Sequence, residues 1–175
     1  MTTSNTSQVN GVEDKPLFDP KILRDLDFET KHRAKYEPHI SIQNPGEMLH
    51  MRPLCKSDYD KARFDSLYSC SDSYYITVIE DLSVHQIIGT GTLVKEQKFI
   101  RNCSSRGRIE DIVVNNTYRG KQLGKLLLDV LTILSQQIDC YKVSLECKDN
   151  MVKFYQQFGF DKEDGQNYMV QRFHE

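Results

Sequence analysis

Residues 106–138 read RGRIEDIVVNNTYRGKQLGKLLLDVLTILSQQI, and this stretch decides the fold. Its first part, 108–114, mixes β-branched residues with two acidic ones, as strands do, and the polar residues 115–117 are typical of a turn. From Leu123 onward, apolar residues recur at steps of three and four, as on one helix face: Leu127, Val130, Leu131, Leu134 and Ile138. The pattern predicts a strand, a short turn and a helix.

The segment 119–124, between the predicted strand and helix, has the sequence RGKQLG. Its two glycines and two cations would bring backbone N–H groups and positive charge to the start of a helix, where a phosphate or pyrophosphate binds readily. Most glycine-containing turns only connect two elements, so the pattern alone leaves both interpretations open.

Length, charge and cysteine content limit the number of domains, the classes of partner and the cellular compartment. The chain has 175 residues, enough for one domain with an extension, and a net charge of −2, which argues against a nucleic-acid partner held by general electrostatics. Five cysteines without metal-binding spacing, and no signal peptide, indicate reduced thiols in a cytoplasmic protein. No apolar run approaches the roughly 18 residues of a membrane-spanning helix, so we expect no membrane insertion.

The chain is divided here into a partly disordered N-terminal arm, 1–45, and a compact domain, 46–175. Residues 1 to about 14 are polar, and we expect disorder there. Residues 16–45 carry scattered apolar side chains and prolines, which fit a short helix and an extended arm packed on the domain or on a second subunit. A partly ordered tail is the other interpretation. The turn NPG at 44–46 marks the start of the domain.

Within the domain, residues 48–54 and 141–147 are predicted strands, and 74–80 pairs with 86–95 as a hairpin. The sequence SDYD at 57–60 resembles a capping box that opens a helix. A polar loop is expected at 101–105 and a short helix at 150–158. Phe160 and then residues 168–173 suggest a closing hairpin or a final strand. The order of elements predicts an α/β fold, with helices packed on a mixed sheet.

This order and its motifs resemble the GCN5-related N-acetyltransferase (GNAT) superfamily, and more narrowly the eukaryotic glucosamine 6-phosphate N-acetyltransferases. The resemblance is carried by RGRIEDIVV with RGKQLGKLLL, by CYKVSLEC, and by KFYQQFGF with YMVQRF, and it continues into the arm at LFDPKIL. It implies a mixed, mostly antiparallel central sheet flanked by helices. It also implies a homodimer that needs no metal and transfers acetyl from acetyl-CoA to the amine of D-glucosamine 6-phosphate. That step lies on the route to UDP-N-acetylglucosamine.

The resemblance assigns acetyl-CoA to the turn and to the strand before it. Backbone amides of the turn would wrap the pyrophosphate, and the pantetheine arm would add to the strand edge. Gln122 stands where many relatives have a glycine, and because glutamine adopts positive φ less cheaply, the turn is expected to rely on Gly120 and Gly124. The implied contacts are Ile112, Val113, Val114, Arg119, Gly120, Lys121, Gln122, Leu123, Gly124, Asn150 and Tyr155. The alternative interpretation of residues 112–114 is that their side chains simply belong to the hydrophobic core.

Asn150 departs by one position from an asparagine of the family, which here is replaced by Met151. It would either contact the pantetheine or cap the following helix.

Two adjacent carboxylates are the candidate base and its neighbour. The resemblance places Glu110 as the general base that takes the amine proton and Asp111 as a residue that orients the sugar. Adjacent strand residues point to opposite faces, but a β-bulge, which the superfamily typically has here, relaxes that limit. Without the resemblance, both would be read as solvated charges at a strand end.

Two further residues complete the implied catalytic set. Tyr155 matches a tyrosine beside the CoA sulfur and would donate a proton to the departing thiolate, although with Phe154 and Phe158 it also fits a helix core. Glu146 matches an acidic residue at the substrate amine or hydroxyls.

The acceptor phosphate needs cations. Lys98 and Arg172 match family positions near it, with Arg172 reaching into the neighbouring subunit's site, and Tyr141 and Lys142 lie in the implied acceptor region. From the sequence alone, either cation would pass as an ordinary surface charge.

The segment 55–73 has 19 residues, enough for one helix and a loop. The family has two helices and a connection there, so roughly twenty residues are missing and no matching threonine is found. Two alternatives follow: a truncated, non-catalytic acetyl-CoA-binding variant that pairs with a full-length subunit, and a protein N-acetyltransferase.

Overall fold

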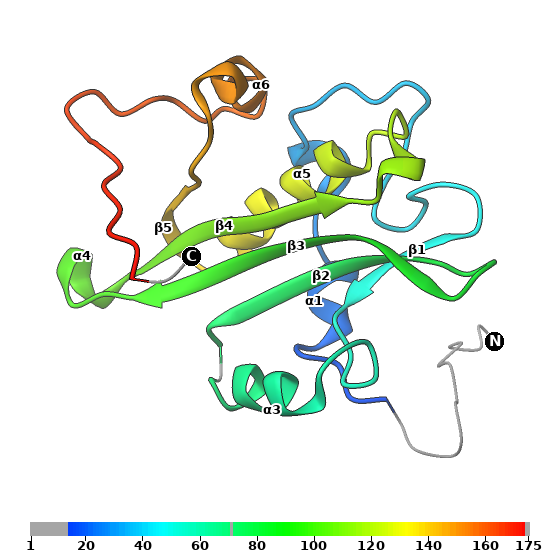
Figure 1. The fold of residues 1–175 in the computed structure, drawn as a ribbon. Helices are drawn as coiled ribbons and strands as arrows, with labels where there is room; N and C mark the ends of the chain where they lie inside the picture. The colour runs from blue at the N-terminus through cyan, green and yellow to red at the C-terminus, as the bar shows by residue number, and fades with distance from the viewer. Residues whose placement is uncertain (1–13, 71, 174–175) are drawn as a thin grey trace.

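The protein is built on one five-stranded sheet, seen in a computed structural model that describes residues 14–70 and 72–173 (Figure 1). The strands lie in chain order, and all neighbours are antiparallel except the last two, which are parallel. The predicted mixed, mostly antiparallel sheet is confirmed. Its strands are β1 (Leu49–Pro53), β2 (Tyr74–Asp81), β3 (Gln86–Gln97), β4 (Ser105–Val114) and β5 (Cys140–Ser144).

One long helix, α5 (Leu123–Gln137), packs on β3, β4 and β5 and confirms the helix predicted from the apolar periodicity. Leu126, Leu127, Val130, Leu131 and Leu134 on its inner side are completely buried. The helix approaches the sheet so closely that a Cβ on Gly91 of β3 would lie 2.9 Å from Leu131 Cδ1.

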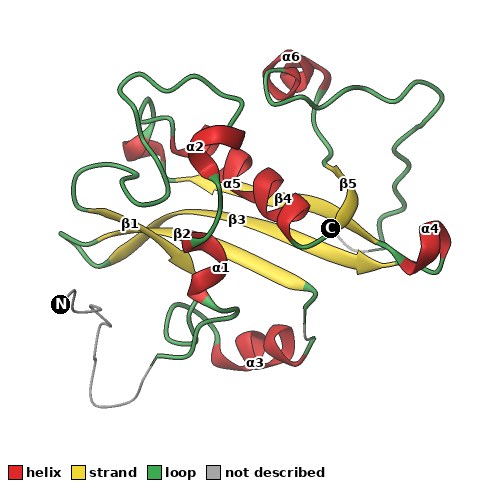
Figure 2. Cartoon of the chain, turned by 180° about the vertical axis from the view of Figure 1, so that it is seen from behind, coloured by secondary structure: helices red, strands yellow, loops and turns green. Residues whose placement is uncertain are grey.

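The arm belongs to the same core. It forms α1 (Pro20–Arg24) and α2 (Phe28–Lys31), which lie on the face of the sheet that α5 covers (Figure 2). Its buried side chains join one hydrophobic cluster with those of α5 and the sheet: Leu23, Leu26, Phe28, Tyr36 and Ile40. Of the interpretations left open by the sequence, packing on the domain is therefore the one observed. The disorder expected for the first residues falls on 1–13, which lie outside the described residues.

Asp129, buried in α5, anchors the arm to the helix. Its carboxylate accepts hydrogen bonds from the backbone N–H groups of Arg33 (3.2 Å) and Ala34 (3.1 Å) and from the Tyr36 hydroxyl (2.8 Å). Burial, together with the charge of Asp129, raises the pKa of Tyr36 far above its usual range. The hydroxyl therefore remains a donor to this carboxylate.

The segment between β1 and β2 holds a single helix, α3 (Lys61–Ser69). The predicted capping box is wrong, because the helix begins after Asp60, which accepts from the Arg63 N–H at 2.6 Å. Ser57 instead bonds Asp14, and Asp58 is held by two hydrogen bonds from Arg52 (2.7 and 2.8 Å). Both side chains are engaged elsewhere, so neither is available as a cap.

Two C-terminal predictions are also wrong. Strand β5 ends at Ser144 rather than 147, and residues 168–173 form no strand in the part of the chain that the structure describes. A strand needs a neighbouring backbone to pair with, and none of the five described strands pairs with that segment. The polar loop expected at 101–105 contains a short turn, α4 (Ile100–Cys103), and 150–158 contains η2 (Asp149–Met151) followed by α6 (Val152–Gln156).

Candidate active site

Strand β4 contains the expected β-bulge. Glu110 pairs with Thr92 of β3, whereas Val113 pairs with Thr90, so two residues of β4 face the single residue between them. Asp111 takes up the irregularity with φ +53°, a left-handed conformation that aspartate tolerates better than most residues. The bulge lets both Glu110 and Asp111 line one cavity of about 240 Å³, together with Arg108, Ile109 and Glu146.

Arg108 links the two glutamates of this cavity. Its Nε lies 2.6 Å from Glu110 Oε1, and its terminal nitrogen Nη2 lies 2.6 Å from Glu146 Oε1. All three side chains are about two-fifths exposed (36%, 38% and 43%), so the pairs order the carboxylates more than they stabilise the fold. The sequence analysis missed Arg108. Its spacing of two from Glu110, which puts both on one strand face, was the available signal.

The edge of β4 next to the cavity is open. The parallel pairing with β5 ends at Arg108 and Ser144, while β4 continues to Val114. Figure 1 shows that the chain after β5 leads away from the sheet to α6. Among the described strands, none covers this side of residues 109–114, so their backbone groups can accept an added strand-like ligand. The side chains of Ile112 and Val114 pack against the core, and Val113 is exposed.

The turn after β4 passes through η1 (Asn116–Tyr118) and delivers residues 119–124 to the start of α5. Gly120 has φ +82°, and a Cβ there would meet no atom within 4 Å. At Gly124, a Cβ would meet only Val114 Cγ2, at 4.0 Å. Both glycines therefore border open space at a helix start that has no side-chain cap, and Arg119 and Lys121 add positive charge.

The expectation for Gln122 is wrong. It adopts the left-handed conformation (φ 62°, ψ 11°) that was assigned to the glycines, and Gly124 lies within the helix. The Gln122 side chain accepts from the Glu37 N–H and donates to the Pro38 carbonyl, both at 3.2 Å. These bonds to the arm offset the steric cost of the conformation.

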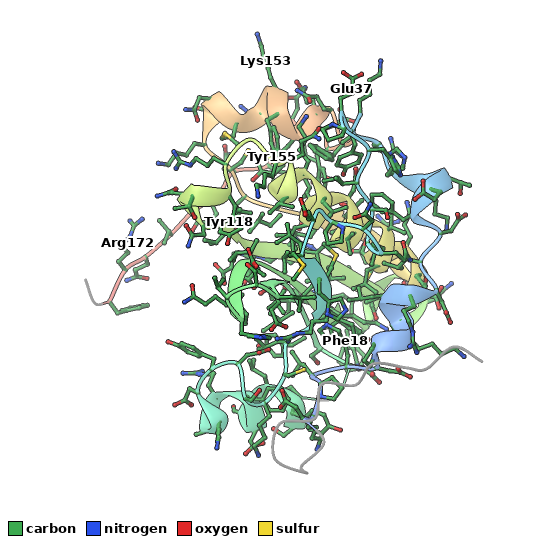
Figure 3. All side chains as sticks on the ribbon, turned by 90° about the vertical axis from the view of Figure 1, so that its right-hand side faces the viewer. Phe18, Glu37, Tyr118, Lys153, Tyr155 and Arg172 are labelled. Atoms are coloured by element: carbon green, nitrogen blue, oxygen red, sulfur yellow. The ribbon has the colours of Figure 1, made fainter. Side chains whose placement is uncertain are left out.

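Tyr155 in α6 is half-buried, between Phe154 (ring centroids 5.2 Å apart) and Phe160 (6.3 Å). Burial, with a smaller contribution from Cys147, raises its pKa, so the phenol holds its proton. Figure 3 shows Tyr155 at the end of the molecule that carries α6. Of the neighbouring aromatics, Phe158 is the buried core residue and Phe154 only packs against the core.

Asn150 is exposed in η2 and caps neither element, because Lys148 and Met151 occupy the N-cap positions. The capping role suggested for it is wrong.

The residues expected around the acceptor phosphate and sugar lie apart from one another on the single chain. None of them lines the cavity: Lys98, Tyr141, Lys142 and Arg172. Lys98 pairs with Glu96 at 2.5 Å, and Lys142 with Glu163 at 3.3 Å. Tyr141 on β5 has Arg101 over its ring at 5.9 Å. Arg172 extends away from the body of the molecule on the C-terminal segment (Figure 3).

The open edge of β4, the bulge at Asp111 and the uncapped start of α5 are the features expected for the donor side of an acetyltransferase. The acetyltransferase (GNAT) family model matches residues 46–160, which is most of the chain, and the chain belongs to that family. Its relatives within the family include glucosamine 6-phosphate N-acetyltransferases from animals, amoebae and plants.

The "probable glucosamine 6-phosphate N-acetyltransferase" of Drosophila melanogaster is 43% identical over 170 residues, covering 85% of this chain and 77% of the relative. "Glucosamine 6-phosphate N-acetyltransferase 1" of Dictyostelium discoideum is 44% identical over 134 residues, covering 65% of this chain and 85% of the relative. The crystal structure of glucosamine-6-phosphate N-acetyltransferase from Arabidopsis thaliana has a TM-score of 0.61 at 29% identity, covering 90% of this chain and 95% of that one.

In the described part of the chain, no helix is both long and apolar enough to cross a membrane. The same residues contain no group of three or more His, Cys, Asp or Glu side chains placed to hold a metal ion. All five cysteines are free thiols.

Proposed function

We propose that this chain transfers the acetyl group of acetyl-CoA to the amine of D-glucosamine 6-phosphate, giving N-acetyl-D-glucosamine 6-phosphate and CoA on the route to UDP-N-acetylglucosamine. One observation carries the proposal: the open edge of β4 runs directly into a cavity lined by Glu110, Asp111 and Glu146. A donor on that edge would present its thioester to an amine held by carboxylates. The names of the relatives at 43% and 44% identity support this sugar phosphate as the acceptor.

The donor would lie along the edge at Ile112, Val113 and Val114. Its pyrophosphate would meet the backbone N–H groups of residues 120–124, with Arg119 and Lys121 nearby. Such contacts hold the thioester in place at little entropic cost once the ligand is bound.

In the reaction, Glu110 takes a proton from the neutral sugar amine as its nitrogen attacks, directly or through a water. The amine nitrogen forms a bond to the acetyl carbon as the carbon–sulfur bond breaks. Tyr155, which holds its proton, donates it to the departing thiolate. Asp111 and Glu146 orient the sugar, and Arg108 keeps Glu110 and Glu146 facing the same cavity.

The acceptor phosphate would be bound by Lys98 and by Arg172 of a second subunit, with Tyr141 and Lys142 beside the sugar. Support for a homodimer comes from the C-terminal segment, where Tyr168, Met169, Val170 and Phe173 are exposed in the single chain. Large apolar side chains gathered on one segment are typical of an interface. We place the enzyme in the cytoplasm.

The test is release of CoA thiol from purified protein with acetyl-CoA and either glucosamine 6-phosphate or glucosamine. Turnover that depends on the phosphate is the expected result, and acetylation of a peptide in its place would favour a protein N-acetyltransferase.

A second candidate is a non-catalytic acetyl-CoA-binding subunit. It is favoured by the single helix between β1 and β2 and by the dispersed acceptor residues. No turnover, with a melting temperature that still rises on addition of acetyl-CoA, would support it.

A further inference from the structure

Residues 33–38 of the arm contact the donor side at three separate points. Asp129 in the middle of α5 holds their backbone. The turn after α6 is contacted by Arg33, because a Cβ on Gly159 would lie only 2.5 Å from the Arg33 Nη1 atom. The third contact is at the start of α5. Figure 3 shows Glu37 at the end of the molecule that also carries α6. The arm therefore crosses the elements that would surround the donor.

The third contact is the one made by the Gln122 side chain. Its amide oxygen accepts from the Glu37 N–H and its amide nitrogen donates to the Pro38 carbonyl, so one carboxamide satisfies both a donor and an acceptor of the arm backbone. A side chain at this N-cap position would ordinarily bond the helix's own N–H groups. Here it makes no such bond. The amides at the start of α5 are left uncapped as a result.

We propose that Gln122 is a positioning residue for CoA, with Glu37 and Pro38 as its fixed support. The inference rests on the proposed function, since it concerns the same donor site. The carboxamide holds residue 122 in the left-handed conformation, and that conformation turns residues 119–121 back over the helix start. The uncapped N–H groups and the cations Arg119 and Lys121 are then presented to the pyrophosphate together.

A left-handed residue without side-chain support would relax toward the right-handed region, which L-residues prefer. Such a change at residue 122 would rotate the peptide groups before α5 and move Gly120 away from the helix start. Glycine at this position would keep access to the left-handed conformation without any support. The alanine and glycine variants therefore separate the effect of the conformation from the effect of the lost side chain.

The helix provides a matched control. Gln137, at the other end of α5, also donates from its side-chain amide to a carbonyl of the arm, that of Ile22, at 3.5 Å. Gln137→Ala removes the same kind of contact between the same two segments, but far along the helix from the turn.

The experiment is calorimetric titration of CoA into the full chain and its variants Q122A, Q122G and Q137A, followed by steady-state kinetics. For Q122A we expect a Kd for CoA about tenfold higher, which corresponds to about 1.4 kcal/mol, and a matching rise in KM for acetyl-CoA with no change in KM for the sugar phosphate. Q122G should lose less affinity than Q122A, and Q137A should match the wild type.

An unchanged Kd in Q122A would overturn the inference, as would an equal loss in Q122A and Q137A. These results would leave the proposed function standing if the wild type turns over. A wild type that binds CoA but acetylates no sugar phosphate would refute the proposed function alone, because the binding comparison remains valid. A wild type that binds no CoA would overturn both.

Discussion

The two sides of this molecule are built in different ways. The donor side lies around the start of α5 and the edge of β4. It is supported by buried leucines and by hydrogen bonds that join the arm to residues of α5 far away in the sequence. The expected acceptor side holds Lys98, Tyr141, Lys142 and Arg172, which are paired locally or exposed. The residues proposed for the donor therefore lie together in the single chain, whereas the residues proposed for the acceptor phosphate lie apart.

The largest expected effect lies where the two sides meet. Glu110→Gln should lower kcat by roughly 10²–10⁴-fold, the usual contribution of a general base, with the Kd of CoA unchanged. Pre-steady-state and steady-state acetyl transfer would measure it. Glu146→Gln is the matched variant, because both carboxylates share Arg108. Should E146Q lose more activity than E110Q, the base would be Glu146.

Substitutions on the two sides should differ in how much they lower the free energy of unfolding. Phe158→Ala removes a ring that is 2% exposed and should lower the free energy of unfolding by about 3–5 kcal/mol. Phe173→Ala, at a ring 77% exposed, should change it by less than about 0.5 kcal/mol in the monomer. Urea unfolding at low protein concentration would measure both. Equal losses would show that the C-terminal segment is as firmly packed as the donor side.

Arg172→Ala should raise the KM for the sugar phosphate by about tenfold or more, because a hydrogen bond to a charged group contributes about 1.5–3 kcal/mol. The KM for acetyl-CoA should stay constant. Lys162→Ala, an exposed cation on the same segment, is the control. An unchanged KM for the sugar phosphate in R172A would remove Arg172 from the acceptor site.

Gly124→Ala should have opposite effects on folding and on binding. Alanine in a helix is favoured over glycine by about 0.5–1 kcal/mol, and the protein leaves room for the methyl group. The melting temperature should rise slightly while the Kd of CoA increases severalfold, because the methyl group occupies space needed by the donor. Thermal unfolding and calorimetry test this, and tighter binding of CoA would contradict the placement of the donor.

The smallest expected effect concerns Asp81, which joins the β2–β3 turn to the segment before α5. Hydrogen bonds from the Ser83 hydroxyl and then from Tyr118 (2.6 Å) lower its pKa from 3.8 to about 2. Because the folded pKa is depressed, the associated stability is present above pH 3.8 and is lost as the pH falls toward 2.

Tyr118→Phe should therefore raise the pKa of Asp81 toward 3.8 and shift this loss to higher pH. Titration of the carboxyl carbon by NMR would measure the change. A pKa that stays near 2 would mean that Ser83 alone sets it.

The sequence predicted the elements whose signals are local. The apolar period of α5, the β2–β3 hairpin and the strand before the turn need only their own residues. The conformation of Gln122 was missed because it depends on residues 84 and 85 positions away in sequence. The pairing of Arg108 with Glu110 follows from their spacing on β4, but its contact with Glu146 becomes apparent only once β4 and the segment after β5 lie together.

The closing strand at 168–173 failed for another reason. Its apolar residues Tyr168, Met169, Val170 and Phe173 favour a strand by composition, but a strand also requires pairing with a second backbone, and none of the five described strands pairs with this segment. The composition of a segment can therefore favour a strand without supplying the neighbour that a strand requires.

The anchoring of the arm by Asp129 also affects how the chain folds. The three groups that bind this carboxylate precede it by 93, 95 and 96 residues. During synthesis the arm leaves the ribosome before α5 does, so it lacks this anchor until α5 has followed it. Contacts of such long range form late and slow the search for the native state. We therefore expect the segment that supports the turn before α5 to be made earlier than α5 and to be ordered only after α5 has packed.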